Sequence, residues 1–252
     1  MDTFNDIYDI PIAHRGLHNE EIPENTIQAY SNAVSAGYNI ELDVRLLKDG
    51  EVVVLHDRNL KRLLNIRTKI THLTSNDIKQ DRYRLPNGEY LVLFKDLVEL
   101  IDGKVSIICE IKKSPAVTHC RLEKAVYEII RSKPWIVVQS FNPTAIEWFR
   151  LNAPEVRRGM LATKAKNIAL RLLYKLVNPY KVLENTKPEF LAYDIKYLPS
   201  KRIAEAVKNY NLQLIAWTVN SNELVKRALE NGVRQIIFED IDPSIYIKKE
   251  TK

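Results

Sequence analysis

Residues 41–56 read ELDVRLLKDGEVVVLH, two segments of strand-like composition around the pair Asp49-Gly50. An Asp-Gly pair between such segments strongly favours a two-residue β-hairpin turn. With these two residues as the turn, the pairing predicts that Asp43 lies directly opposite His56. The stretch therefore predicts a hairpin that carries charged and titratable side chains in strand positions.

Glu41 and Asp43 are two residues apart, so their side chains share one face of the strand, and a cross-strand partner such as His56 shares it too. In the alternative arrangement, residues 44–50 form a loop and the segment ending at His56 is a separate barrel strand. Both arrangements bring the three side chains to one site. Burial of such charges is costly unless a partner compensates them, so we expect a compensating group nearby.

Short segments rich in Ile, Val and Leu alternate with segments of helical periodicity along the rest of the chain, which predicts repeated βα units around a parallel sheet. A (β/α)8 TIM barrel uses eight strands in roughly 250 residues. The chain has 252 residues and nine candidate strands, so one candidate is surplus. We predict a single α/β domain over residues 1–252, with a small polar excursion at about 57–92. The candidates are IPIAH, NIELDV, EVVVLH, VSIICEIK, WIVVQSF, RRGML, FLAYDI, LQLIAWTV and RQIIF.

Composition narrows the class of protein. The two cysteines are too few for a disulfide framework, and the N-terminal segment lacks the pattern of a signal peptide, so we expect a cytoplasmic protein. The net charge of +6 could favour anionic partners, but no nucleic-acid recognition motif accompanies it, and no protein partner is evident.

Residues 164–181 combine basic side chains with an apolar stripe and could rest weakly against an anionic membrane surface. The preferred interpretation is an outer barrel helix whose lysines face water.

Three acidic residues, Glu41, Asp43 and Glu110, lie on predicted barrel strands whose carboxyl ends meet at one mouth. Three adjacent carboxylates repel one another and need a cation, and oxygen donors favour Mg²⁺ or Ca²⁺ over zinc. The alternative is that each acid pairs with a basic side chain, as Glu110 could with Lys112. The three acids together favour a metal site.

Basic side chains and imidazoles accompany these acids at the strand ends, namely His14, Arg15, His56 and Lys112. Arginine and lysine suit a phosphate group, and two histidines can divide the work of general base and general acid near neutral pH. This combination predicts phosphodiester cleavage.

The chain resembles the glycerophosphodiester phosphodiesterases through a series of motifs in the same order. These motifs are HRGLHNEEIPENT (14–26), IELDVRLLKDGEVVVLHD (40–57), CEIK (109–112), QSFNP (139–143) and AWTVN (216–220). The resemblance implies a TIM barrel with a small insertion after the HD motif. It also implies metal-dependent hydrolysis of glycerophosphodiesters to glycerol 3-phosphate and an alcohol, as part of glycerophospholipid metabolism.

Roles for individual residues follow from this resemblance and remain expectations. The resemblance assigns the acid-base pair to His14 and His56, the metal to Glu41, Asp43 and Glu110, the phosphate to Arg15 and Lys112, and the substrate pocket to Phe141 and Trp217. Either aromatic side chain could equally belong to the core.

Two alternatives stay open for the function. A lysophospholipase D would use the same catalytic set with a wider pocket, and a non-catalytic module could bind a phosphate ligand on the same scaffold. One departure from the family pattern also stands out. The last strand commonly ends in Thr-Asp-Xaa-Pro, whereas this chain has Phe238 and Glu239 before Asp240. We therefore expect an altered closing turn.

Overall fold

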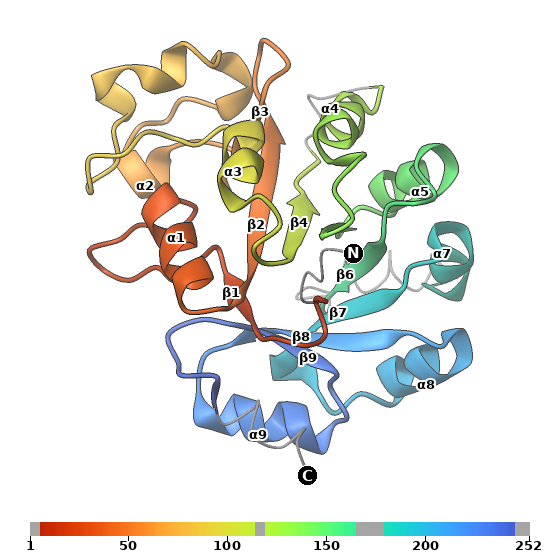
Figure 1. Ribbon diagram of the computed structural model, residues 1–252. Coiled ribbons are helices and arrows are strands. Elements are labelled where there is room, and N and C mark those ends of the chain that lie inside the picture. The colour runs from red at the N-terminus through yellow and green to blue at the C-terminus, as the bar shows by residue number, and fades with distance from the viewer. Residues whose placement is uncertain (1–5, 114–118, 165–178, 245–252) are drawn as a thin grey trace.

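A computed structural model describes residues 6–113, 119–164 and 179–244, which fold into a closed barrel (Figure 1). Within these residues, eight parallel strands pair in the order β1-β2-β4-β5-β6-β7-β8-β9, and β9 returns to pair with β1. The predicted (β/α)8 barrel is therefore confirmed. The barrel strands are β1 (Ile12–His14), β2 (Asn39–Leu46), β4 (Ile107–Ile111), β5 (Ile136–Ser140), β6 (Arg158–Ala162), β7 (Phe190–Asp194), β8 (Gln213–Val219) and β9 (Gln235–Phe238).

Helices between successive strands surround the barrel (Figure 1). None of the helices in the described residues is long and apolar enough to cross a membrane, and the cytoplasmic location stays a prediction. The helices are α1 (Ile27–Ser35), α3 (Phe94–Ile101), α4 (Arg121–Ile130), α5 (Pro143–Asn152), α7 (Pro179–Thr186), α8 (Lys201–Tyr210) and α9 (Asn222–Glu230), with a 3-10 turn, η4 (Ile195–Tyr197), after β7.

The stretch 41–56 forms a hairpin, since β3 (Val52–Val54) pairs antiparallel with β2 and is the surplus candidate strand. The predicted pairing of Asp43 with His56 is wrong by one residue. Leu46 lies opposite Val52, and the Leu55 N–H donates to the carbonyl of Asp43 at 2.8 Å.

The error comes from the length of the hairpin loop. The Leu47 N–H donates to the carbonyl of Glu51 at 2.8 Å, so three residues form the loop, and Gly50 has φ of +95°. A three-residue loop of this kind places a glycine in the left-handed region at its end. His56 consequently follows the paired strand instead of facing Asp43 across it.

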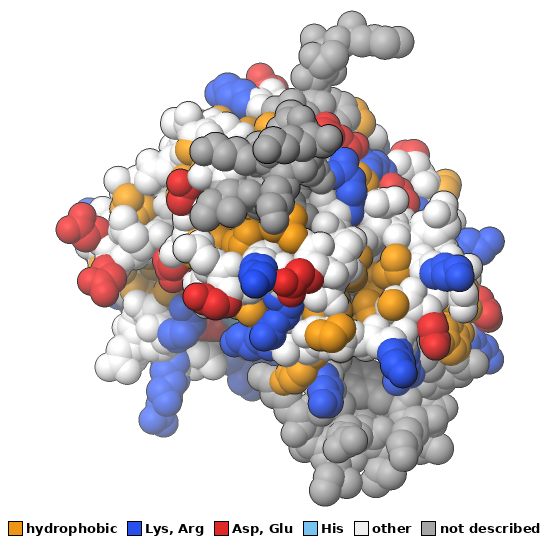
Figure 2. Space-filling view, turned by 90° about the horizontal axis from the view of Figure 1, so that it is seen from below, with side chains coloured by type: hydrophobic (Ala, Val, Ile, Leu, Met, Phe, Trp, Pro, Cys, Tyr) orange, Lys and Arg blue, Asp and Glu red, His pale blue; other side chains and the backbone are white. Residues whose placement is uncertain are grey.

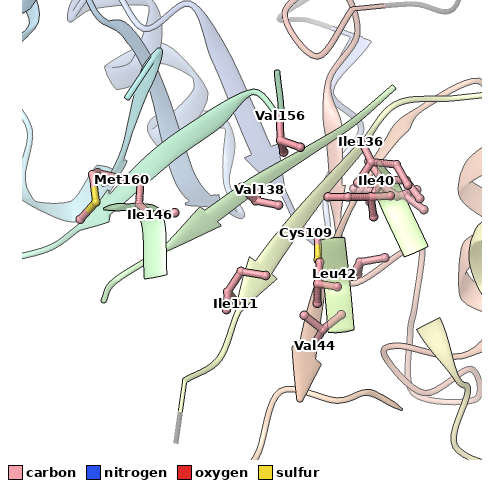
Figure 3. Close-up of a cluster of buried hydrophobic side chains, with 14 of the residues drawn as sticks. Ile40, Leu42, Val44, Cys109, Ile111, Ile136, Val138, Ile146, Val156 and Met160 are labelled. Carbon is pink, nitrogen blue, oxygen red and sulfur yellow. The ribbon is translucent and has the colours of Figure 1, made fainter. Parts of the chain in front are cut away.

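Side chains on the barrel strands alternate between the helices and the barrel interior. Outward residues form a large apolar cluster with the helices, shown in Figure 3 with Ile40, Leu42 and Val44 of β2. A second cluster fills the barrel interior and includes Ile12, Ile108, Ile215 and Ile237. The inward positions two residues later hold His14, Glu110, Trp217 and Glu239. An apolar layer therefore closes the barrel below a layer of polar and aromatic groups.

The predicted insertion at 57–92 is a small lobe beside β3 (Figure 1). Its own apolar cluster contains Leu60, Ile70 and Ile78, which pack with Val53 and Leu55 of the hairpin. The lobe is thereby attached to the hairpin that ends at His56. Its elements are α2 (Lys61–Leu64) and three 3-10 turns, η1 (Ile70–His72), η2 (Asp77–Lys79) and η3 (Asp81–Tyr83).

The segment predicted to contact a membrane, 164–181, lies mostly outside the described residues, because 165–178 are not described. That contact therefore stays a prediction. On the face that carries α9, acidic and basic side chains lie interspersed, as Figure 2 shows. The described part of this face presents both signs of charge.

Gly159 provides a test of packing inside the barrel. A Cβ atom at this position would lie 2.1 Å from the ring of Phe190, its fully buried partner on the neighbouring strand. We expect Gly159→Ala to lower the free energy of unfolding by about 1–3 kcal/mol through overpacking. Urea denaturation measures the effect, and adding Phe190→Leu should recover part of the loss. Equal stability of Gly159→Ala and the wild type would contradict this packing.

Candidate active site

The acidic residues of neighbouring strands lie side by side at the carboxyl end of the barrel. His14 of β1 pairs in register with Glu41 of β2, and Asp43 pairs with Glu110 of β4. All three carboxylates are buried, and each offers an oxygen within 4.8 Å of the others. The structure therefore brings together the three acids that the sequence placed at one mouth.

Two cations contact this cluster directly. The Lys112 Nζ lies 3.0 Å from Asp43 Oδ1 and 2.7 Å from Glu110 Oε1, and the Arg15 Nε lies 3.0 Å from Asp43 Oδ2. The backbone N–H of Arg15 donates to Glu41 Oε2 at 3.3 Å. The pairing of Glu110 with Lys112 thus occurs, but two cations leave one of the three negative charges uncompensated.

The pKa values of the carboxyl groups reflect this imbalance. Burial raises the pKa of Glu41 well above its usual range, and the charges of Asp43 and Glu110 raise it further. Burial also raises the pKa of Glu110, to about 7, although Lys112 opposes the shift. For Asp43, burial raises the pKa, but Lys112 and Arg15 more than offset burial and lower it below its usual value.

The donor set therefore fits a hard divalent cation. Three buried carboxylates supply only oxygen ligands, which Mg²⁺ and Ca²⁺ prefer. Burial is the main cause of the raised pKa values of Glu41 and Glu110, and the nearby cations do not offset it. A divalent ion would supply the missing positive charge.

A sharp turn after β1 directs Arg15 into the cluster. Arg15 and Gly16 both have positive φ, at +55° and +84°. A Cβ at position 16 would lie 2.7 Å from the backbone carbon of Ala29, so only glycine allows this approach of the turn to α1. The guanidinium then reaches Glu24, with Nη1 to Oε1 at 3.0 Å, and this carboxylate was not singled out in the sequence.

His14 contacts carboxylates through both ring nitrogens. Its Nδ1 hydrogen-bonds to Glu239 Oε2 at 2.6 Å, and its Nε2 lies 3.9 Å from Glu41 Oε2. The bond from His14 lowers the pKa of Glu239. His18 Nε2 lies 3.6 Å from the other oxygen of Glu239. The imidazole of His14 is therefore held between the barrel wall and the acidic cluster.

His56 has a carboxylate partner of its own. Its Nδ1 bonds to Asp57 Oδ1 at 2.8 Å, and Arg62 holds the second oxygen of Asp57 at 2.7 Å. The buried side chain of Arg45 donates from both Nε and Nη2 to the carbonyl of His56. Burial lowers the pKa of His56, and Lys112 adds to this shift, while the charge of Asp43 opposes it.

The two predicted pocket aromatics contact each other. The rings of Phe141 and Trp217 meet edge to face with centroids 5.5 Å apart, and Phe141 is 43% exposed. The buried Nε1 of Trp217 has no hydrogen-bond partner among the described residues, nor has the Oε1 of Gln139 on β5.

Several residues around the predicted set were not expected to contribute. The inward direction of Glu239 could have been predicted from strand alternation, because Glu239 follows the inward Ile237 by two residues. The sequence predicted only an altered turn at this position. Arg45 also follows Asp43 by two residues on β2. The bridge from Arg62 to Asp57 and Glu24 depends on the insertion and has no comparable signal.

The barrel and the acidic centre at the carboxyl ends of its strands define the class of protein as a (β/α)8-barrel enzyme. Residues 14–243 match the model of the glycerophosphoryl diester phosphodiesterase family, and the chain belongs to this family. The predictions of the family and of a phosphodiesterase enzyme are thereby confirmed.

Individual relatives agree with this placement. A glycerophosphodiester phosphodiesterase of Caldanaerobacter subterraneus subsp. tengcongensis is 28% identical, over 91% of this chain and 93% of its own length. One from Bacillus altitudinis is 26% identical over 95% and 98%, respectively. The fold resembles that of an Oleispira antarctica phosphodiesterase solved in complex with the product sn-glycerol-3-phosphate, with a TM-score of 0.76, 22% identity and 98% coverage of both chains.

The acidic cluster predicts how metal binding depends on pH. Between about pH 4.5 and 7, the folded metal-free protein retains a proton on Glu110 that the unfolded chain has lost, so this group's contribution to stability falls as pH rises. A divalent ion removes the repulsion at high pH but competes with that proton at low pH. We expect saturating Mg²⁺ or Ca²⁺ to raise Tm by about 5–10 °C at pH 8 and by less at pH 5.5.

Differential scanning fluorimetry measures both shifts. Glu110→Gln removes a ligand and a negative charge, and it should abolish most of the stabilisation at pH 8. Equal shifts at the two pH values, or a shift that survives in Glu110→Gln, would contradict a metal site at these carboxylates.

Proposed function

We propose that the protein is a metal-dependent phosphodiesterase that hydrolyses glycerophosphodiesters to glycerol 3-phosphate and an alcohol in glycerophospholipid metabolism. The observation that carries this proposal is the buried cluster of Glu41, Asp43 and Glu110, with two cations and a carboxylate-bound imidazole in contact with it. A divalent ion would offset the negative charge of this cluster, and the positive charge that it adds would favour an anionic substrate.

In this proposal the three carboxylates hold one Mg²⁺ or Ca²⁺, which when bound polarises a phosphate oxygen and neutralises charge. Lys112 and Arg15 each lie 3.0 Å from Asp43, so both cations stand beside the carboxylates at which the substrate phosphate would bind. In this proposal Arg15 and Lys112 supply positive charge and N–H donors to that phosphate.

His14 and His56 divide the proton transfers. The 2-hydroxyl of the glycerol group is an internal nucleophile with a high effective concentration. One imidazole takes its proton as the oxygen attacks phosphorus, and the other imidazole protonates the departing alcohol. Water then opens the resulting cyclic phosphate to glycerol 3-phosphate. Each Nδ1 bonds to a carboxylate, which leaves each Nε2 available for these transfers.

In this proposal Phe141 and Trp217, whose rings meet edge to face, form an apolar wall for the glycerol backbone or the alcohol. This wall favours lysophospholipase D activity as a second candidate. A cavity of about 940 Å³ adjoins Phe141 and lies in the outer layer between the strands β6 and β7 and the helices α7 and α8, with mainly apolar lining residues that include Met160, Leu191 and Tyr193. An acyl chain would need such a space.

A non-catalytic phosphate-binding module is the candidate from another class. It would have no use for two histidines that each carry a carboxylate partner. The contacts of His14 and His56 therefore favour an enzyme over a binding module.

A substrate panel tests the reaction. We expect the purified protein with Mg²⁺ or Ca²⁺ to release glycerol 3-phosphate from glycerophosphodiesters, and chelation to remove the activity. Parallel reactions with lysophospholipids, followed through released lysophosphatidic acid, separate the second candidate from the first. Turnover that survives chelation on every substrate would contradict the metal assignment, and the absence of turnover throughout would favour the binding module.

Substitution of the histidines tests their roles. We expect His14→Ala and His56→Ala each to lower kcat by about 10²–10⁴-fold, because each removes one of the two proton transfers. Circular dichroism and the metal-induced shift in Tm should stay close to the wild type. The exposed His72 in the insertion provides a matched control, and His72→Ala should retain full activity. Loss of the folded state in both active-site variants would remove this support for catalytic roles.

A further inference from the structure

Glu239 lies between two imidazoles at the mouth of the barrel. Its Oε2 is 2.6 Å from His14 Nδ1, and its Oε1 is 3.6 Å from His18 Nε2. All three side chains are at least partly buried, and they form the second group of clustered ligand-type side chains in the described residues. The two oxygens of one carboxylate are thus directed at different histidines.

The barrel wall fixes the position of Glu239. Ile12 pairs in register with Ile237 of β9, and Ala13 pairs with Phe238, so the next pair along the two strands is His14 and Glu239. The backbone N–H of Glu239 donates to the carbonyl of Val219 at 3.1 Å, which ties this residue to the end of β8.

The residues on either side explain the unusual closing turn. Phe238 points outward, where its ring meets Tyr38 edge to face at 5.0 Å. Asp240 has φ of +55°, and the chain turns away from the barrel there. Phe238 therefore belongs to the outer apolar layer, and the alternation of side chains along the strand directs Glu239 inward.

We propose that Glu239 is a positioning residue for His14, with His18 Nε2 facing its second oxygen at 3.6 Å, beyond hydrogen-bond distance. This inference rests on the proposed function of His14 in proton transfer. An ionised carboxylate only accepts hydrogen bonds, so the Nδ1 of His14 carries the proton in this contact. The Nε2 of His14 then presents its lone pair toward the acidic cluster, where it lies 3.9 Å from Glu41.

Chemical rescue separates this role from a merely structural one. A pocket of about 380 Å³ lined by Gly16, His18 and Glu239 adjoins the carboxylate, so formate can reach the space vacated in Glu239→Ala. We expect Glu239→Ala to lower kcat by about 10–100-fold with KM and the metal-induced Tm shift unchanged. Added formate should restore part of kcat, and it should restore none in His14→Ala.

Further variants test the geometry. Glu239→Asp keeps the charge but shortens the side chain, and it should have a kcat between those of the wild type and Glu239→Ala. His18→Phe should lower kcat less than Glu239→Ala does. Glu21→Gln, at an exposed position in the same β1–α1 connection, removes one negative charge and should leave kcat unchanged. A kcat for Glu239→Ala within twofold of the wild type, or a loss that formate does not restore, would overturn the inference.

The tautomer of His14 gives a readout that does not depend on activity. In nitrogen-15 correlation spectra of the wild type, we expect His14 to be protonated at Nδ1, and in Glu239→Gln we expect this preference to weaken. Protonation at Nε2 in the wild type would overturn the inference even in an active enzyme. A protein with the expected tautomer but no turnover on any substrate would instead refute the proposed function alone.

Discussion

An excess of negative charge in a buried place is the constraint on which the rest of this structure depends. Glu41, Asp43 and Glu110 are buried within one another's reach, while Arg15 and Lys112 supply only two positive charges. Isolated buried charges cost several kcal/mol, so the barrel tolerates this cluster only with partners fixed in place. The sharp turn after β1 brings Arg15 to the acids, and Lys112, the residue that follows β4, contacts them as well. A divalent ion completes the balance in the function proposed here.

The histidines show how orientation is obtained from different parts of the chain. His14 is held by a carboxylate on the neighbouring barrel strand, whereas His56 is held by the next residue in sequence and by Arg62 from the insertion. In both, a carboxylate bonds to Nδ1 and leaves the opposite ring nitrogen without a contact of hydrogen-bond length among the described residues. The same carboxylate–imidazole pair is thus formed twice, from different parts of the chain. Such support for an imidazole commonly determines how well it transfers protons.

Much of the fold and of the acidic centre could be predicted from the sequence because two simple periodicities control them. Alternation along β2 and β4 places the three acids on the inner face, and parallel strands bring their ends to one edge. The hairpin register could not be read from the Asp-Gly pair, since the backbone at Gly50 decides between a two- and a three-residue loop. The contact of Arg45 with the carbonyl of His56 was also hidden, because a side chain that binds backbone leaves no pattern in the sequence. The division into one domain and the roles of individual residues stay predictions.

The hairpin that ends at His56 has a mechanical consequence. His14 lies on β1, one of the eight strands of the closed barrel. His56 follows β3, which lies outside this ring of strands and packs against the insertion. A change of volume among Leu60, Ile70 and Ile78 would therefore act more directly on His56 than on His14. The spacing between the two imidazoles therefore depends in part on an apolar lobe that lies outside the ring of strands. In the proposed function, substitutions in that lobe offer a route to fitting leaving groups of different size.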